Sequence, residues 1–145
     1  MFGTVAVVSL LVLFLVMIDF PKVEPYLYPI HLLKKKPERI SEYVWIGGYM
    51  EEKELIEFLK KNNIKVVISL LSDTMIHEKK LLRKEKRFLE RKGIKFYSVP
   101  MNPFLKEGRK VRRLRQLLRK RRKVYIHSYL GRIRTRIVKE VLGVK

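Results

Sequence analysis

Apolar residues are spaced differently in two parts of the chain. Residues 2–18 (FGTVAVVSLLVLFLVMI) contain no charged side chain, whereas from residue 43 onward short apolar runs alternate with amphipathic stretches. An uncharged apolar run of this length is at the short end for one membrane-spanning helix. Short apolar runs that alternate with helix-periodic stretches are typical of strands and helices in alternation. The pattern predicts an N-terminal membrane helix followed by a small α/β domain.

Four short runs rich in β-branched and aromatic residues predict strands, at residues 43–48, 64–71, 94–99 and 123–128. Amphipathic periodicity predicts helices at residues 51–62, 75–92, 108–121 and 134–142. The buried face expected for the second helix consists of Met75, Ile76, Leu81, Leu82, Phe88 and Leu89. Strands that alternate with helices indicate a mostly parallel central sheet flanked by helices.

The N-terminal apolar segment predicts the organisation of the chain. We expect a transmembrane anchor at residues 1–20, a proline-containing linker at 21–42 and a folded domain at 43–145. A cleaved signal peptide would need a basic first region and a small-residue cleavage site, and DFPKVEP follows instead. The alternative is a buried N-terminal helix, which a domain this small could hardly enclose. Basic residues lie only on the C-terminal side, including Lys34–Lys36, so the positive-inside rule places the domain of this single-pass protein in the cytoplasm.

Composition narrows the chemistry and the partners. The chain has no cysteine and three histidines, which excludes disulfides and a thiol nucleophile and leaves no expected metal or cofactor. Its formal net charge is +20, and residues 74–123 hold twenty Lys or Arg against four Glu. This excess favours anionic partners such as anionic lipid or phosphorylated protein. Nucleic acid is not expected, because no RNA- or DNA-binding module is recognisable. The alternatives are a thermophile-like charged surface and a merely solvated helix face.

The stretch VYIHSYLGRIRTRI at residues 124–137 has the features of an anion-binding loop between a strand and a helix. A loop that enters a helix directs backbone N–H groups toward one point, and the helix dipole adds partial positive charge there. Gly131 allows the backbone to turn without a Cβ clash. Arg134, at the expected start of the helix, has a planar fork that can donate to two phosphate oxygens at once.

The residues HSYLGRIRT resemble the signature of protein tyrosine and dual-specificity phosphatases, His-Cys-x-x-Gly-x-x-Arg-Ser/Thr, with His127, Gly131, Arg134 and Thr135 in register. Together with the upstream runs YVWIGG, IKVVISL and IKFYSVPMN, the resemblance extends over about residues 43–142 and favours the compact dual-specificity type. It implies that His127 supports the loop and that Arg134 clamps the phosphate. It further implies a phosphate-binding loop made of Ser128, Tyr129, Leu130, Gly131, Arg132, Ile133, Arg134 and Thr135.

Two departures from the family pattern affect the chemical step. Ser128 stands at the position of the cysteine nucleophile, and a serine hydroxyl needs an adjacent base to attack. His127 precedes it in the strand, so its side chain is expected on the opposite face. Asn102 stands at the position of the general-acid aspartate and cannot donate a proton to the leaving oxygen. Loss of acid–base help alone lowers a rate by about 10²–10⁴-fold.

The sequence therefore predicts a membrane-anchored, catalytically inactive phosphatase-like domain, a pseudophosphatase, that binds phosphorylated protein or a phosphoinositide through residues 128–135. One alternative is a residually active protein or lipid phosphatase that uses Ser128. A second is a basic protein with a vestigial loop that interacts with a membrane surface or nucleic acid. A third is an engineered substrate trap, which the second loss at Asn102 disfavours.

Overall fold

The computed structural model describes residues 7–9, 34–101 and 108–143. The chain divides into two compact units, Met1–Leu32 and Leu33–Lys145, and the folded domain is the second of them. The predicted anchor at residues 2–18 lies outside the described residues, except for residues 7–9. Among the residues that are described, no helix is long and apolar enough to cross a membrane.

The domain is built on a five-stranded sheet with strand order β1-β2-β5-β3-β4. The strands are β1 (Glu38–Arg39), β2 (Val44–Gly47), β3 (Val66–Ser69), β4 (Lys95–Ser98) and β5 (Val124–His127). Strands β2, β5, β3 and β4 run parallel to one another, and β1 is antiparallel to β2. The mostly parallel sheet predicted from the sequence is confirmed. The short strand β1 falls in the segment expected to be a linker, because backbone pairing with Trp45 and Ile46 draws it into the sheet.

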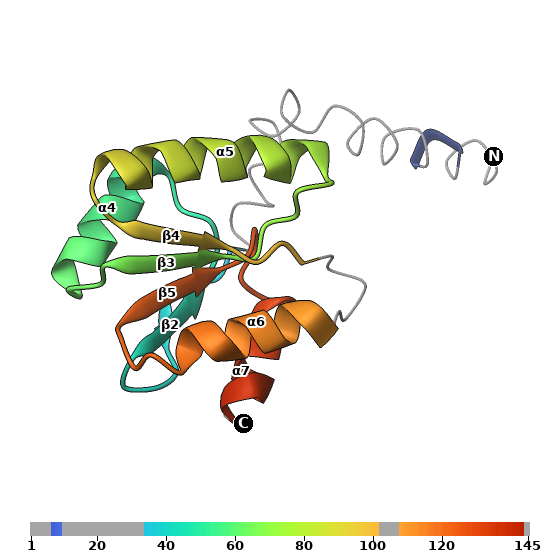
Figure 1. Ribbon diagram of the computed structural model, residues 1–145. Helices are drawn as coiled ribbons and strands as arrows, with labels where there is room; N and C mark the ends of the chain where they lie inside the picture. The colour runs from blue at the N-terminus through green and yellow to red at the C-terminus, as the bar shows by residue number, and fades with distance from the viewer. Residues whose placement is uncertain (1–6, 10–33, 102–107, 144–145) are drawn as a thin grey trace. The chain divides into compact units, whose positions relative to one another are not determined.

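Helices cover both faces of the sheet (Figure 1). They are α4 (Glu52–Lys61), α5 (Ile76–Arg91), α6 (Gly108–Leu118) and α7 (Thr135–Leu142). Alternation along the strands divides the core in two, because successive side chains point to opposite faces. Leu114 of α6 and Val138 of α7 pack with Ile46, Ile68 and Ile126 on one face. Leu55 and Leu59 of α4 and Phe88 and Leu89 of α5 pack with Trp45, Val67 and Tyr125 on the other.

The buried face of α5 differs from the predicted one. Phe88 and Leu89 are buried as expected, but Ile76 is 65% exposed, and Glu78 and Glu85 are buried instead. Glutamates on a helix rich in lysine and arginine are ordinarily solvent-exposed, and burial of a carboxylate needs a cationic or hydrogen-bonding partner. The partners of both glutamates come from the segment that contains the predicted phosphate loop.

The parallel strands end together at one edge of the sheet, which we call the carboxyl edge. In register, Gly47 of β2 and Ser69 of β3 both lie beside His127 of β5, and Ser98 of β4 lies beside Ser69. Ligands of open α/β sheets bind at this edge. The segment after β5, which is the predicted phosphate loop, therefore lies where the topology favours a binding site.

Candidate functional site

Residues 128–135, which we call the signature loop, are fixed to the carboxyl edge by backbone hydrogen bonds. The Ser128 amide donates to the Gly47 carbonyl at 3.3 Å. The carbonyls of Tyr129 and Leu130 accept from the amides of Tyr49 and Lys35 at 3.0 and 2.7 Å. The loop therefore begins with its backbone held from the β2 side.

Gly131 is the one position of the loop that no other residue can occupy without a shift of the backbone. Its φ is +74°, and a Cβ there would lie 2.3 Å from the carbonyl carbon of Gly47. A side chain would meet backbone atoms of β2, which cannot rotate away. The glycine of the signature pattern is thus required both by its dihedral angle and by the close approach of β2.

Ser128 is buried, and its hydroxyl is held within the loop. Its Oγ accepts a hydrogen bond from the Gly131 amide at 3.0 Å. An amide directed at this atom stabilises negative charge there, as a thiolate nucleophile would require. A hydroxyl gains little from it without a base, because it is almost wholly protonated near neutral pH.

His127 faces away from the Ser128 hydroxyl. Its Nε2 lies 2.6 Å from Oε1 of Glu85 on α5, and its Nδ1 lies 3.4 Å from the backbone oxygen of Ser128. Both His127 and Glu85 are almost fully buried. The two ring nitrogens are therefore directed at other oxygen atoms, and His127 is not placed to act as a base for Ser128.

Tyr125 packs behind this pair and links it to β2. Its ring stacks on that of His127 with centroids 5.7 Å apart, and its hydroxyl donates to the Gly48 carbonyl at 2.7 Å. Burial raises the pKa of Tyr125 well above its usual value of 10.0, and the negative charges of Glu85 and Glu54 raise it further. The phenol therefore stays a hydrogen-bond donor, and it fixes the backbone next to the loop.

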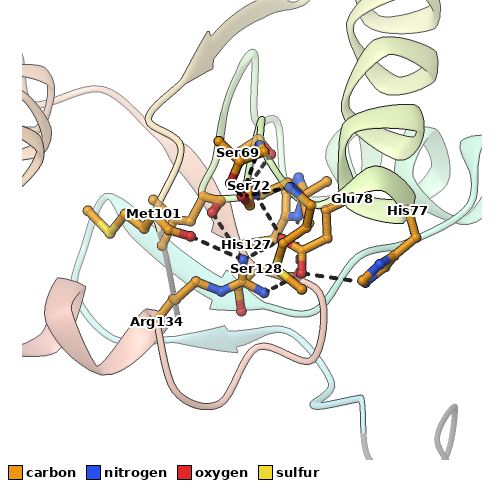
Figure 2. A network of polar contacts seen from close by, with 12 residues as sticks. Ser69, Ser72, His77, Glu78, Met101, His127, Ser128 and Arg134 are labelled. Carbon is orange, nitrogen blue, oxygen red and sulfur yellow. Dashed lines mark hydrogen bonds and ion pairs between the residues drawn. The ribbon is translucent and has the colours of Figure 1, made fainter. Parts of the chain in front are cut away.

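Arg134 is buried and forms a two-point ion pair with Glu78 of α5 (Figure 2). Its Nη1 donates to Glu78 Oε1 and its Nη2 to Glu78 Oε2, the latter at 3.0 Å. Nη1 also lies 3.4 Å from the carbonyls of Leu70 and Met101, which follow β3 and β4. The guanidinium is thereby fixed in position by helix α5 and by the segments that follow β3 and β4.

A turn before α5 holds Glu78 in place. The Ser72 hydroxyl accepts from the amides of Thr74 and Met75 at 3.2 and 3.3 Å, which closes a turn just before the helix. The Ser72 amide donates to Glu78 Oε1 at 2.8 Å. Glu78 thus has two kinds of donor, the backbone and Arg134, and both compensate the cost of burying its charge.

The contacts of Arg134 leave one edge of its guanidinium for a ligand. A guanidinium has five N–H donors, and the end formed by Nη1 and Nη2 is taken by Glu78. Within the described part of the chain, Nε has no hydrogen-bond partner, and Nη2 donates only to Glu78. The edge formed by Nε and Nη2 is the one that could donate to two oxygens of a phosphate.

The structure brings together most, but not all, of the site predicted from the sequence. His127, Ser128, Tyr129, Gly131, Arg134 and Thr135 are buried, Leu130 is partly buried, and Arg132 and Ile133 are exposed. Asn102, the predicted general-acid position, lies outside the described residues. Its neighbour Met101 has its carbonyl beside Arg134. Among the described residues, no group of His, Asp or Glu could hold a metal ion.

Glu78 and Glu85 are the site residues that sequence reasoning missed. Both are glutamates on the predominantly basic helix α5, and they are seven residues apart, which places them on one face. Their seven-residue spacing was the feature of the sequence that could have indicated a shared, buried helix face. It could not identify Arg134 and His127 as the partners, because those residues follow more than forty positions later.

Comparison with solved structures identifies the fold. The domain superposes on a DUF442 protein from Shewanella putrefaciens CN-32 with a TM-score of 0.61 and 15% identity, covering 72% of this chain and 66% of that chain. For a cysteine-to-serine variant of P. aeruginosa TpbA in complex with phosphotyrosine, the TM-score is 0.53 and the identity 18%, covering 68% of this chain and 56% of that chain. For the core of the S. cerevisiae PP-IP phosphatase SIW14, the TM-score is 0.55 and the identity 16%, covering 68% and 59%.

No protein-family model and no curated protein matches the chain. It spans about two thirds or less of the three structures compared above. The likeness shows that the domain has a protein tyrosine phosphatase-like fold of the dual-specificity type, as the signature resemblance implies.

Proposed function

We propose that this protein is a phosphatase-like domain that binds phosphorylated ligands through its signature loop and does not hydrolyse them at an appreciable rate. The ligand is a phosphorylated protein or a phosphorylated lipid headgroup. Residues 2–18 hold the domain at a membrane, with the domain on the cytoplasmic side.

The observation that carries the proposal is the placement of Arg134. Its guanidinium is fixed by Glu78 and by two backbone carbonyls, and the edge formed by Nε and Nη2 faces none of the described acceptors. A preoriented arginine loses little rotamer entropy when it binds, so its two donors gain more from an anion than a mobile side chain would. Gly131 and the start of α7 add the loop backbone and the helix dipole to the same cradle.

The absence of rapid hydrolysis is supported by the surroundings of Ser128. Among the described residues, its hydroxyl contacts the Gly131 amide and no base, since His127 is engaged by Glu85. With asparagine at position 102, the sequence also lacks the acid that would protonate a leaving oxygen. The alternative of residual hydrolysis by Ser128 is less well supported for these reasons.

One neighbouring structure supports binding without a cysteine. The TpbA variant in which serine replaces cysteine is in complex with phosphotyrosine. In that protein a serine is thus compatible with a bound phosphorylated aromatic group. The same combination, a phosphatase-like fold with serine and a phosphorylated ligand, is the one proposed for this chain.

The test is the affinity of the full chain for a phosphotyrosyl peptide and for a soluble short-chain phosphoinositide, measured by calorimetry. Arg134→Lys keeps the positive charge beside Glu78 but removes the planar fork, so we expect at least a tenfold weaker affinity for whichever ligand binds. The thermal midpoint of each variant shows that the fold is kept.

Arg112→Ala is the matched control. Arg112 is exposed on α6, so this variant removes one positive charge without touching the loop. An equal loss of affinity in both variants, or an unchanged affinity in Arg134→Lys, would contradict the proposal. Release of phosphate from an aryl phosphate by the unaltered chain, absent in Ser128→Ala, would instead favour the residually active alternative.

A further inference from the structure

Two exposed isoleucines are placed at the carboxyl edge, next to the phosphate cradle. In the described part of the folded domain, Ile76 and Ile133 are the large apolar residues with high exposure, at 65% and 57%. Ile133 precedes Arg134 in the signature loop, and Ile76 lies two residues before Glu78, the partner of that arginine. The rings of His77 and Tyr129, 5.9 Å apart, join the same two segments. Both isoleucines therefore lie at the rim of the candidate site.

Cations surround the same edge. A pocket of about 120 Å³ beside the loop is lined by Lys35, Ile46, Arg132, Thr135, Arg136 and Lys139. The Nζ of Lys34 lies 4.6 Å from the ring centroid of Tyr129. Among the described residues, Glu38 contacts this group through Lys35 at 2.8 Å and Lys139 at 3.6 Å, and the hydrogen bond from Lys35 lowers the pKa of Glu38. The cations at this edge therefore outnumber the carboxylate of Glu38.

The first described residues of the folded domain also lie at this edge. The second compact unit begins at Leu33, and the Lys35 amide is bonded to the Leu130 carbonyl of the signature loop at 2.7 Å. Lys34 and Lys35 therefore belong to the rim of the candidate site.

We propose that the carboxyl edge is a membrane-contacting surface, on which Ile76 and Ile133 enter the interface of an anionic bilayer while the signature loop takes a phosphorylated lipid headgroup. The proposal rests on the phosphate-binding function above and names the ligand class for that site. Apolar side chains flanked by cations match the two layers of such an interface, since the acyl boundary accepts the former and headgroup phosphates the latter. A slot for a phosphotyrosine ring would instead be lined by partly buried side chains.

The test uses the absence of cysteine in the chain, which makes an introduced cysteine the sole site for a thiol-reactive label. An environment-sensitive fluorophore is attached to Ile76→Cys in the full chain. The control is Lys65→Cys, an exposed position just before β3 and hence at the opposite edge of the sheet. Vesicles contain phosphatidylcholine alone or with phosphatidylinositol monophosphate, and a third set is matched in charge with phosphatidylserine.

We expect a blue shift of the Ile76→Cys label with phosphatidylinositol monophosphate vesicles, a smaller one with phosphatidylserine and none with phosphatidylcholine alone. The Lys65→Cys label should not shift with any of them. In an Arg134→Lys background, the excess shift of phosphatidylinositol monophosphate over phosphatidylserine should disappear. This readout reports the orientation of the domain, whether or not residues 2–18 hold the chain on the vesicle.

Failure of this proposal is distinguishable from failure of the proposed function. If the soluble headgroup binds but the two labels respond alike, or neither responds, phosphate binding stands and the membrane-contacting surface is wrong. If a phosphotyrosyl peptide shifts the Ile76→Cys label while vesicles do not, the ligand is a protein and the proposal is overturned. If neither soluble ligand binds and the label responds equally to both anionic lipids, the proposed function fails, and with it the headgroup assignment.

Discussion

At the scale of single residues, the proposed separation of phosphate binding from catalysis depends on the identity of position 128. The Gly131 amide is directed at Ser128 Oγ, and Arg134 is fixed nearby through Glu78. These groups would stabilise a thiolate and a transferring phosphoryl group equally well. In the proposed function, the chemical step is lost because serine stands at the nucleophile position and asparagine at the expected acid position.

The double variant Ser128→Cys with Asn102→Asp should therefore gain phosphatase activity. We expect hydrolysis of an aryl phosphate at least 10²-fold faster than with the unaltered chain, because acid–base catalysis alone contributes about that factor. Steady-state release of phosphate measures it. Ser128→Cys combined with Arg134→Lys is the control, and activity in that control equal to the double variant would show that the loop does not bind the reacting phosphate.

Glu78→Gln should destabilise the domain, because it leaves the buried Arg134 without its counter-charge. Removing one member of a buried ion pair costs about 3–5 kcal/mol in the free energy of unfolding. Glu57→Gln, which changes an exposed glutamate of α4, should stay within about 0.5 kcal/mol. Denaturant titration measures both. A loss in Glu78→Gln no larger than in this control would mean that the ion pair does not stabilise the loop.

At the scale of elements, the site depends on the close packing of one loop against one strand. The loop backbone approaches β2 so closely that a Cβ on Gly131 would overlap Gly47, while the Tyr129 and Leu130 carbonyls are bonded to Tyr49 and Lys35. Helix α5 completes the arrangement from the other side, since Glu78 holds the arginine and Glu85 holds the histidine. The shape of the cradle is thus shared by β2, the loop and α5.

Gly131→Ala should disrupt this arrangement far more than the same change elsewhere. Gly93 has a similar φ of +71°, but a Cβ there would have no heavy atom within 4 Å. Gly93→Ala should cost about 1–2 kcal/mol, the usual penalty of a left-handed conformation for an L-residue. Gly131→Ala should cost at least 1 kcal/mol more and abolish phosphate-ligand binding, as judged by thermal unfolding and calorimetry. Equal costs in the two variants would contradict the close approach to β2.

At the scale of the whole molecule, most of the positive charge is solvated, and the few acids that are buried are used in the site. Helix α6 and the turn after it, residues 108–123, carry no acid, and most of their arginines are exposed. Glu78 and Glu85, by contrast, are both buried next to the signature loop. The net charge therefore favours approach to anionic surfaces, whereas the proposed binding of a phosphate depends on the interior pairs.

The stability of the whole domain should fall above about pH 10, in part through Tyr125. Because burial raises the pKa of Tyr125 above its unfolded value of 10.0, the unfolded chain loses this proton first. The contribution of the Tyr125 phenol to the free energy of unfolding is fully present below about pH 10. Above this pH it is lost at up to about 1.4 kcal/mol per pH unit. Tyr125→Phe should lose about 1 kcal/mol at neutral pH with its bond to Gly48, and should show a shallower decline at high pH.

Tyr97→Phe is the control, because it should change the pH dependence of stability in the opposite direction to Tyr125→Phe. The hydrogen bond and charge of Arg122 lower the pKa of Tyr97, so its ionised form favours the folded state as the pH rises. Removal of the Tyr97 hydroxyl should therefore make the stability of the domain fall more steeply at high pH. Denaturant unfolding from neutral to high pH measures all three proteins. A decline in Tyr125→Phe as steep as in the unaltered chain would show that the phenol is not buried as described.

The sequence by itself determined the order of the strands and helices from residue 43 onward, the mostly parallel sheet and the position of the loop after β5. These follow from local periodicity and from a motif of nine contiguous residues, and such signals do not require knowledge of distant contacts. The absence of cysteine and the presence of Ser128 likewise exclude a thiolate nucleophile in the loop.

Only the tertiary structure decided which charged residues are buried and which apolar ones are exposed. Glu78 and Glu85 are stable inside the domain because folding brings Arg134 and His127 to them, from more than forty residues away. Ile76 is exposed because the glutamates, and not the first apolar residue of α5, face the loop. Burial of a charge depends on its partner in space, and spacing along a single helix does not specify that partner.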